Sequence, residues 1–103
     1  MKTYDKAVRD RIPEMIERSG KTCVTEVLPP EEFERKLNEK LREEVEEYLE
    51  SRSIEELADL VEVVYGILEM RNISLEQFEE LRLAKKKERG GFSQRICLRS
   101  VSD

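Results

Sequence analysis

The residues of this chain best suited to chemistry are the carboxylates of residues 43–62, EEVEEYLESRSIEELADLVE. Nine of these twenty residues are Asp or Glu, and two pairs share a spacing of three, namely Glu44 with Glu47 and Glu56 with Asp59. Side chains three apart on a helix lie on the same face. Two adjacent helices could therefore surround one small volume with four carboxylates, which repel one another unless a cation lies between them.

The other reactive residue types narrow the chemistry. The chain has no His, and its two cysteines, Cys23 and Cys97, are far apart in the sequence. This excludes Ser–His and Cys–His nucleophile systems and histidine-based metal sites. A metal would be bound by oxygen, which favours Mg²⁺, Mn²⁺ or Ca²⁺. Unpaired thiols, no signal peptide and no apolar run of membrane-spanning length lead us to expect a cytoplasmic protein without a membrane partner.

The hydrophobic pattern predicts a mainly α protein with one domain over residues 1–103. We expect four helices, over Ile12–Ser19, Glu31–Glu50, Ile54 to about Met70, and from the cap at Ser74 to about Lys87. Short extended segments are expected at the N- and C-terminal ends, although residues 4–11 could instead form a helical turn. Residues 21–28 and 92–101 alternate in the manner of short strands that could pair.

Helical-wheel positions separate the acids that face inward from those that face water. Glu44 lies inside the apolar arc of the second helix and Glu56 inside that of the third, while Glu47 and Asp59 lie at the borders. A buried, unpaired carboxylate becomes protonated, acquires a partner or binds a metal, so these four are candidate ligands. Glu62 is expected at the rim of the site. The remaining acids of this segment are expected on the surface, namely Glu43, Glu46, Glu50 and Glu55.

Simpler roles exist for both inward acids. Ser53 and Glu56 have the spacing of a capping box, in which the glutamate bonds back to the backbone of the serine. Glu44 is one turn after Lys40 and could form an ordinary helical ion pair with it.

The third predicted helix is apolar around about two-thirds of its circumference. A single chain of 103 residues has little material with which to cover such a helix. We therefore predict a homodimer, or a higher homo-oligomer, formed through this helix.

The acid pairs Glu44–Glu47 and Glu56–Asp59 resemble the ExxE…ExxD motif of the all-α nucleoside triphosphate pyrophosphohydrolases, a superfamily that includes MazG-like proteins and phosphoribosyl-ATP pyrophosphohydrolase. The segments VRDRIPEMI and KERGGFSQRICL resemble small stand-alone MazG-like members. The resemblance implies a four-helix-bundle-type fold completed by dimerisation, and cleavage of a nucleotide between its α- and β-phosphates. It implies Mg²⁺ bound by these four acids, with Glu44 or Glu47 acting on the attacking water.

Basic residues near both ends of the chain are candidate phosphate ligands, because Arg and Lys suit phosphate. Three lie in the first matched segment or just before it, and three flank Gly90-Gly91: Lys6, Arg9, Arg11, Lys86, Arg89 and Arg95. Bases near residue 86 could instead complement the C-terminus of the fourth helix.

Two other functions are compatible with the sequence. The chain could be a non-enzymatic helical module that binds a protein partner or a divalent ion through its apolar third helix. Residues 82–99 have a net charge of +6 and could bind nucleic acid, but the net charge of the chain is −5, which makes a nucleic-acid partner the weakest interpretation.

Overall fold

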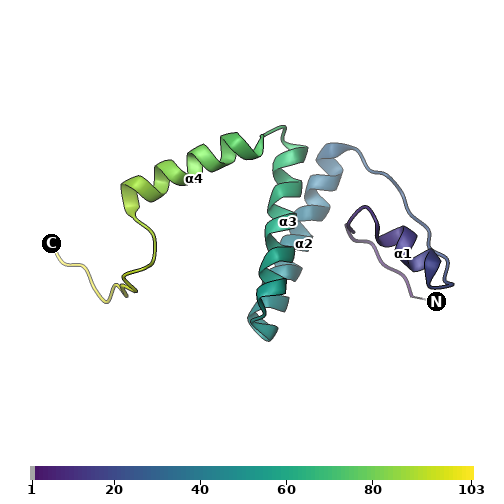
Figure 1. Cartoon of the computed structure of the whole chain (residues 1–103), viewed down its shortest axis with the longest axis horizontal. Helices are drawn as coiled ribbons and strands as arrows, with labels where there is room; N and C mark the ends of the chain where they lie inside the picture. The colour runs from purple at the N-terminus through teal and green to yellow at the C-terminus, as the bar shows by residue number, and fades with distance from the viewer. Residues whose placement is uncertain (1) are drawn as a thin grey trace. The chain divides into compact units, whose positions relative to one another are not determined.

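The structure, a computed structural model, describes residues 2–103 and has four helices and no strand within that range. The helices are α1 (Ile12–Arg18), α2 (Pro30–Ser51), α3 (Ile54–Met70) and α4 (Leu75–Arg89) (Figure 1). The expectation of a mainly α protein is confirmed, and each predicted helix is present with ends that differ by at most two residues. None of the helices in this range is long and apolar enough to cross a membrane.

The chain divides into two compact units, one ending at Ile73 and the other running Ser74–Asp103. In the first unit, α2 and α3 pack along each other (Figure 1). Their contacts run in opposite order, because Glu34 pairs with Arg71 at 3.7 Å while Glu44 lies near Asp59. The two helices therefore form an antiparallel hairpin.

The hairpin helices approach each other closely at Gly66. A Cβ atom at this position would lie 3.3 Å from Leu37 Cδ1, so the absence of a side chain lets Leu37 lie against the α3 backbone. The turn between the helices is only two residues long, and its first residue, Arg52, has the left-handed φ of 59° that commonly ends a helix. This short turn and the Leu37–Gly66 contact together set the register of α2 against α3.

The core of the hairpin includes a residue from outside the helices. Ala7 is buried together with Leu37 and Val63, and the half-buried side chains around them are Phe33, Leu41, Ile67 and Met70. Residues 2–9, which we name the N-terminal strap, have no regular secondary structure. Asp5 Oδ2 accepts a hydrogen bond of 3.0 Å from Lys36 Nζ on α2. The strap is therefore held on the hairpin by one buried side chain and by ion pairs, of which Asp5–Lys36 is the first along the chain.

The two capping-box predictions have different outcomes. At α4, the Ser74 side chain accepts from Gln77 N and the Gln77 side chain accepts from Ser74 N, so this box is confirmed. At α3, Ser53 Oγ accepts from Glu56 N at 3.3 Å, but Ser53 N donates to Ser51 Oγ instead of to the Glu56 carboxylate. The Glu56 carboxylate is consequently not used by the cap.

The predicted pairing of residues 21–28 with 92–101 was wrong, since both segments lack regular secondary structure. Val24 and Val27, which would lie on opposite faces of the first strand, are both fully exposed, so neither face of this segment is buried by its valine. An isolated two-stranded ribbon without a buried face is marginal in water, so alternation alone did not produce strands.

The second unit consists of α4 and the tail that follows it. Lys86, Lys87 and Arg89 lie in the last turn of α4, where positive charge complements the helix dipole. Phe92 is 97% exposed, and Ile96 and Leu98 are also exposed, so the second unit by itself does not bury these apolar side chains of the tail.

Replacement of Leu37 by Ala tests whether the Leu37–Gly66 contact organises the hairpin. We expect Leu37→Ala to lower the free energy of unfolding by about 2–4 kcal/mol, because it opens a cavity against α3. Urea denaturation followed by circular dichroism measures this, with Leu81→Ala on the exposed surface of α4 as the matched control. Equal effects of the two substitutions would contradict the role given to Leu37.

Candidate metal centre on the helical hairpin

The hairpin brings the predicted acids together in two overlapping groups. Glu44, Glu56 and Asp59 offer one oxygen each, and these three oxygens lie within 4.8 Å of one another. Glu44 also forms such a group with Glu47 and with its neighbour Glu43. All four predicted ligands thus lie in one of the two groups, and Glu44 is the member that both groups share.

Glu44 is the buried acid of the hairpin. It is only 6% exposed, and no other charged or polar residue of the described range is classed as buried. Its Oε1 lies 3.5 Å from Lys40 Nζ, whereas its Oε2 is buried without a hydrogen-bond partner. The ion pair that the sequence offered as an alternative role is therefore present, but it leaves half of this carboxylate unsatisfied.

Glu56 is unsatisfied in the same way. Its carboxylate takes no part in the cap of α3, and its Oε2 is buried without a hydrogen-bond partner. A buried polar atom without a partner is costly to the fold and is uncommon in native proteins. Two such oxygens, on Glu44 and Glu56, belong to one three-carboxylate group, which makes this group the candidate site of the hairpin.

Burial and mutual repulsion raise the pKa values of both acids. Desolvation is the largest cause for Glu44, and the charges of Glu47 and Asp59 add to it while Lys40 opposes them. Desolvation is also the largest cause of the raised pKa of Glu56, followed by the charge of Glu47. Glu47 is itself exposed, yet it lies close enough to affect both Glu44 and Glu56. A bound cation would reverse this penalty on the ionised forms.

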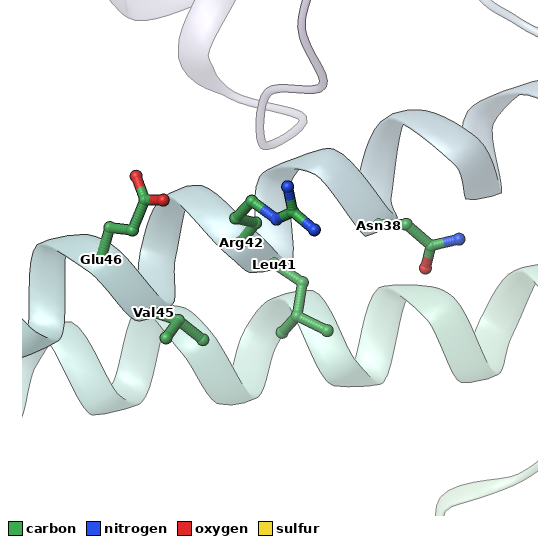
Figure 2. Close-up of a pocket in the computed structure, with 5 residues that line it drawn as sticks. All are labelled: Asn38, Leu41, Arg42, Val45 and Glu46. Carbon is green, nitrogen blue, oxygen red and sulfur yellow. The ribbon is translucent and has the colours of Figure 1, made fainter.

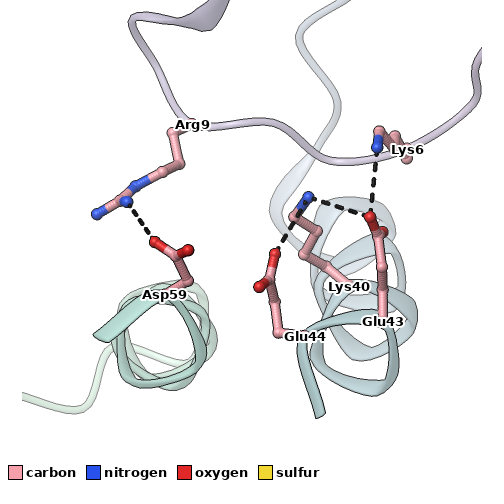
Figure 3. Close-up of polar contacts among 6 residues, drawn as sticks. All are labelled: Lys6, Arg9, Lys40, Glu43, Glu44 and Asp59. Carbon is pink, nitrogen blue, oxygen red and sulfur yellow. Dashed lines mark hydrogen bonds and ion pairs between the residues drawn. The ribbon is translucent and has the colours of Figure 1, made fainter. Parts of the chain in front are cut away.

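The structure places Glu43 differently from the prediction. It was expected on the far surface of α2, but it is half-buried and pairs with Lys6 at 3.3 Å and with Lys40 at 3.7 Å (Figure 3). The reason is the N-terminal strap, which covers this side of α2. A helical wheel considers one helix alone and cannot show that another segment packs there. Besides Glu43, Lys40 lies beside the site although it was not among the predicted site residues.

The strap also brings two predicted phosphate ligands to the acids. Lys6 lies over Glu43, and Arg9 Nη1 donates to Asp59 Oδ1 at 3.2 Å (Figure 3). Arg9 Nη2 lies 3.7 Å from Glu62 Oε1, so the predicted rim residue shares this arginine with Asp59. Arg11, just before α1, is exposed and forms no ion pair within residues 2–103.

Three other phosphate candidates lie in the second unit. Lys86 and Arg89 are on α4, in the turn where their charges complement the helix C-terminus. Arg95 lies in the tail and has a left-handed φ of 55°. Their roles toward phosphate stay predictions.

The donor set fits a hard divalent cation. Every candidate ligand is a carboxylate oxygen, the type that Mg²⁺, Mn²⁺ and Ca²⁺ prefer. Opposite ligands of Mg²⁺ are about 4 Å apart and those of Ca²⁺ about 5 Å, twice their metal–oxygen distances. Separations within 4.8 Å therefore allow these oxygens to bind one ion with little movement of the side chains.

A shallow depression elsewhere on α2 does not include these acids. Its lining residues, labelled in Figure 2, are Asn38, Leu41, Arg42, Val45 and Glu46. None of them belongs to either carboxylate group. The depression is therefore separate from the candidate metal ligands.

Comparison with known proteins gives no further assignment: no protein-family model, curated protein or solved structure matches this chain.

The raised pKa of Glu44 predicts how stability depends on pH when chelator removes metal. The folded chain keeps a proton that the unfolded chain releases, so this contribution to stability is present below the ordinary glutamate pKa and is lost as pH rises through the raised value. We expect Glu44→Gln to melt at a higher temperature than wild type at pH 8, with the difference shrinking toward pH 4. Thermal melts in EDTA measure this, and Glu50→Gln should show no such trend. A difference that does not change with pH would contradict the assignment.

Proposed function

We propose that this protein is a Mg²⁺-dependent nucleotide pyrophosphohydrolase that converts a nucleoside triphosphate, or a related nucleotide, to the monophosphate and pyrophosphate. The proposal rests above all on Glu44, a buried carboxylate with an unpartnered oxygen that belongs to two three-carboxylate groups. The resemblance of the acid pairs to the ExxE…ExxD motif supports the reaction class. With it we propose the all-α nucleoside triphosphate pyrophosphatase fold and MazG-like membership.

In this mechanism Glu44, Glu56 and Asp59 hold the metal, and Glu47 completes the set from the exposed side. Bound Mg²⁺ supplies positive charge that neutralises the phosphates and lowers the pKa of water. Glu44 or Glu47 accepts a proton from the attacking water. The water oxygen bonds to the α-phosphorus, the bond from that phosphorus to the bridging oxygen breaks, and pyrophosphate leaves with the bond's electron pair.

The charges beside the acids suit a polyphosphate. Lys6 and Arg9 lie on the strap directly over the carboxylates, so phosphate oxygens that approach from this face meet two cations. Arg binds phosphate with two parallel hydrogen bonds, which also fixes its orientation. No residue of this surface indicates which base or sugar is bound, so the proposal is limited to the class of substrate.

We further propose a homodimer formed through α3. Four of its exposed residues repeat at intervals of four, three and four, namely Ile54, Ala58, Val61 and Tyr65. Such a spacing forms a continuous apolar stripe on one side of a helix, as in helices that pack on a second helix. Within the described range no side chain is less than 2% exposed, which indicates that the chain alone leaves much of its apolar surface uncovered.

A non-enzymatic module is the second candidate function. The exposed apolar tail after α4, with Phe92, Ile96 and Leu98, is the observation in its favour. It predicts metal binding or partner binding without turnover of any nucleotide, which distinguishes it from the first proposal.

Pyrophosphate release across a panel of nucleoside triphosphates, with Mg²⁺ or Mn²⁺, tests the activity. We expect Glu44→Gln and Asp59→Asn to reduce turnover by roughly 100-fold or more, because each removes a carboxylate that acts on the metal or the water. Glu50→Gln and Glu69→Gln change exposed acids outside both groups and should retain activity. Full activity in Glu44→Gln would refute the site, and no release from any nucleotide would favour the non-enzymatic module.

Light scattering coupled to size exclusion tests the dimer. We expect wild type at twice the chain mass of 12.2 kDa, and the double variant Val61→Glu/Tyr65→Glu at the mass of one chain, because charges would enter the apolar stripe. Val24→Glu adds a charge at a fully exposed position outside α3 and should remain dimeric. A monomeric wild type at working concentration would contradict the proposal.

A further inference from the structure

Arg9 occupies a carboxylate that the metal centre would also use. Its guanidinium donates to Asp59 Oδ1 at 3.2 Å and lies 3.7 Å from Glu62 Oε1 (Figure 3). Asp59 is in turn one of the three acids grouped around the unpartnered oxygens of Glu44 and Glu56. The guanidinium of Arg9 therefore neutralises a carboxylate charge that a bound divalent ion would otherwise neutralise.

This internal ion pair is easily exchanged. The side chains of Arg9 and Asp59 are 59% and 44% exposed, and ion pairs between exposed groups contribute little to stability. A divalent ion that binds Asp59 together with Glu44 and Glu56 both competes for the carboxylate and repels the guanidinium. The two cations thus bind this acid in competition.

The strap keeps Arg9 near the site after such an exchange. Ala7, two residues away, is 4% exposed within the hairpin core, and Asp5 remains bound to Lys36 on α2. The released guanidinium is therefore confined to the neighbourhood of the carboxylates, at little cost in conformational freedom. It is then available to an anion that approaches the same face.

We infer that Arg9 is an exchangeable counter-ion: a divalent cation bound by Glu44, Glu56 and Asp59 releases it from Asp59, and the released guanidinium then binds a phosphate group. The second half of this inference rests on the proposed function. Before metal binds, Arg9 offsets part of the repulsion among the acids. Once metal binds, the same side chain becomes a phosphate ligand, so metal binding should precede tight binding of the anion.

Isothermal titration calorimetry on the full chain tests both halves with opposite expected signs. We expect Arg9→Ala to bind Mn²⁺ and Mg²⁺ about two- to fivefold more tightly than wild type, the range that one exposed ion pair contributes. The same variant, saturated with Mg²⁺, should bind inorganic pyrophosphate about tenfold or more weakly, because a charge-assisted hydrogen bond is lost. A residue with only a structural role would weaken binding of both ligands.

Arg18→Ala is the matched control, since it removes the same charge from an exposed arginine that pairs with Glu14 on α1. It should change neither affinity. Thermal melts confirm that the variants fold, and the side-chain ¹⁵Nε resonance of Arg9 gives a readout in wild type, where it should shift during Mg²⁺ titration before any anion is added.

Metal affinity that is unchanged or weaker in Arg9→Ala, or a wild-type chain that binds neither metal, would overturn the exchange. Tighter metal binding without weaker pyrophosphate binding would overturn the second half alone. If Arg9→Ala shows both expected changes but wild type hydrolyses no nucleotide, the exchange stands and the proposed enzymatic function fails.

Discussion

The antiparallel packing of α2 on α3 is the constraint on which the rest of the first unit depends. Gly66 lets Leu37 approach the α3 backbone, and the two-residue turn at Arg52 and Ser53 leaves the helices little freedom to slide. Because each helix advances regularly from this contact, its register also determines that Glu44 lies near Asp59. One apolar contact thus positions acids that are almost two helical turns away from it.

That same packing makes the group of Glu44, Glu56 and Asp59 electrostatically unfavourable when no cation is bound. It buries Glu44, leaves oxygens of Glu44 and Glu56 without partners, and raises the pKa values of both. The fold offsets the repulsion only in part, through Lys40 from α2 and through Lys6 and Arg9 from the strap. Such a balance is typical of functional sites, where a fold retains unfavourable electrostatics that a ligand relieves. The packing of the hairpin and the metal site that we propose on it are therefore two consequences of one arrangement.

Sequence reasoning succeeded where one helix was enough to decide the outcome. The helix limits and the Ser74–Gln77 cap follow from residues close together in the chain, and the inward position of Glu44 follows from the apolar face of α2 alone. It failed where a second segment was needed. Glu43 was assigned to the surface because nothing in α2 shows that the strap packs over it. The predicted strands failed for the complementary reason, since Val24 and Val27 have the right residue type but no surface on which to be buried.

The sequence by itself determined the helices, the oxygen-only character of any metal ligands and the two acid pairs at helical spacing, because these depend on residue type and on local geometry. Only the tertiary structure decided which oxygens lack partners, that the Glu56 carboxylate is free of its cap, and that the strap brings Lys6 and Arg9 over the acids. These properties depend on contacts between residues fifty or more positions apart, such as Arg9 and Asp59. Their energies arise from burial and charge in three dimensions, which no local pattern records.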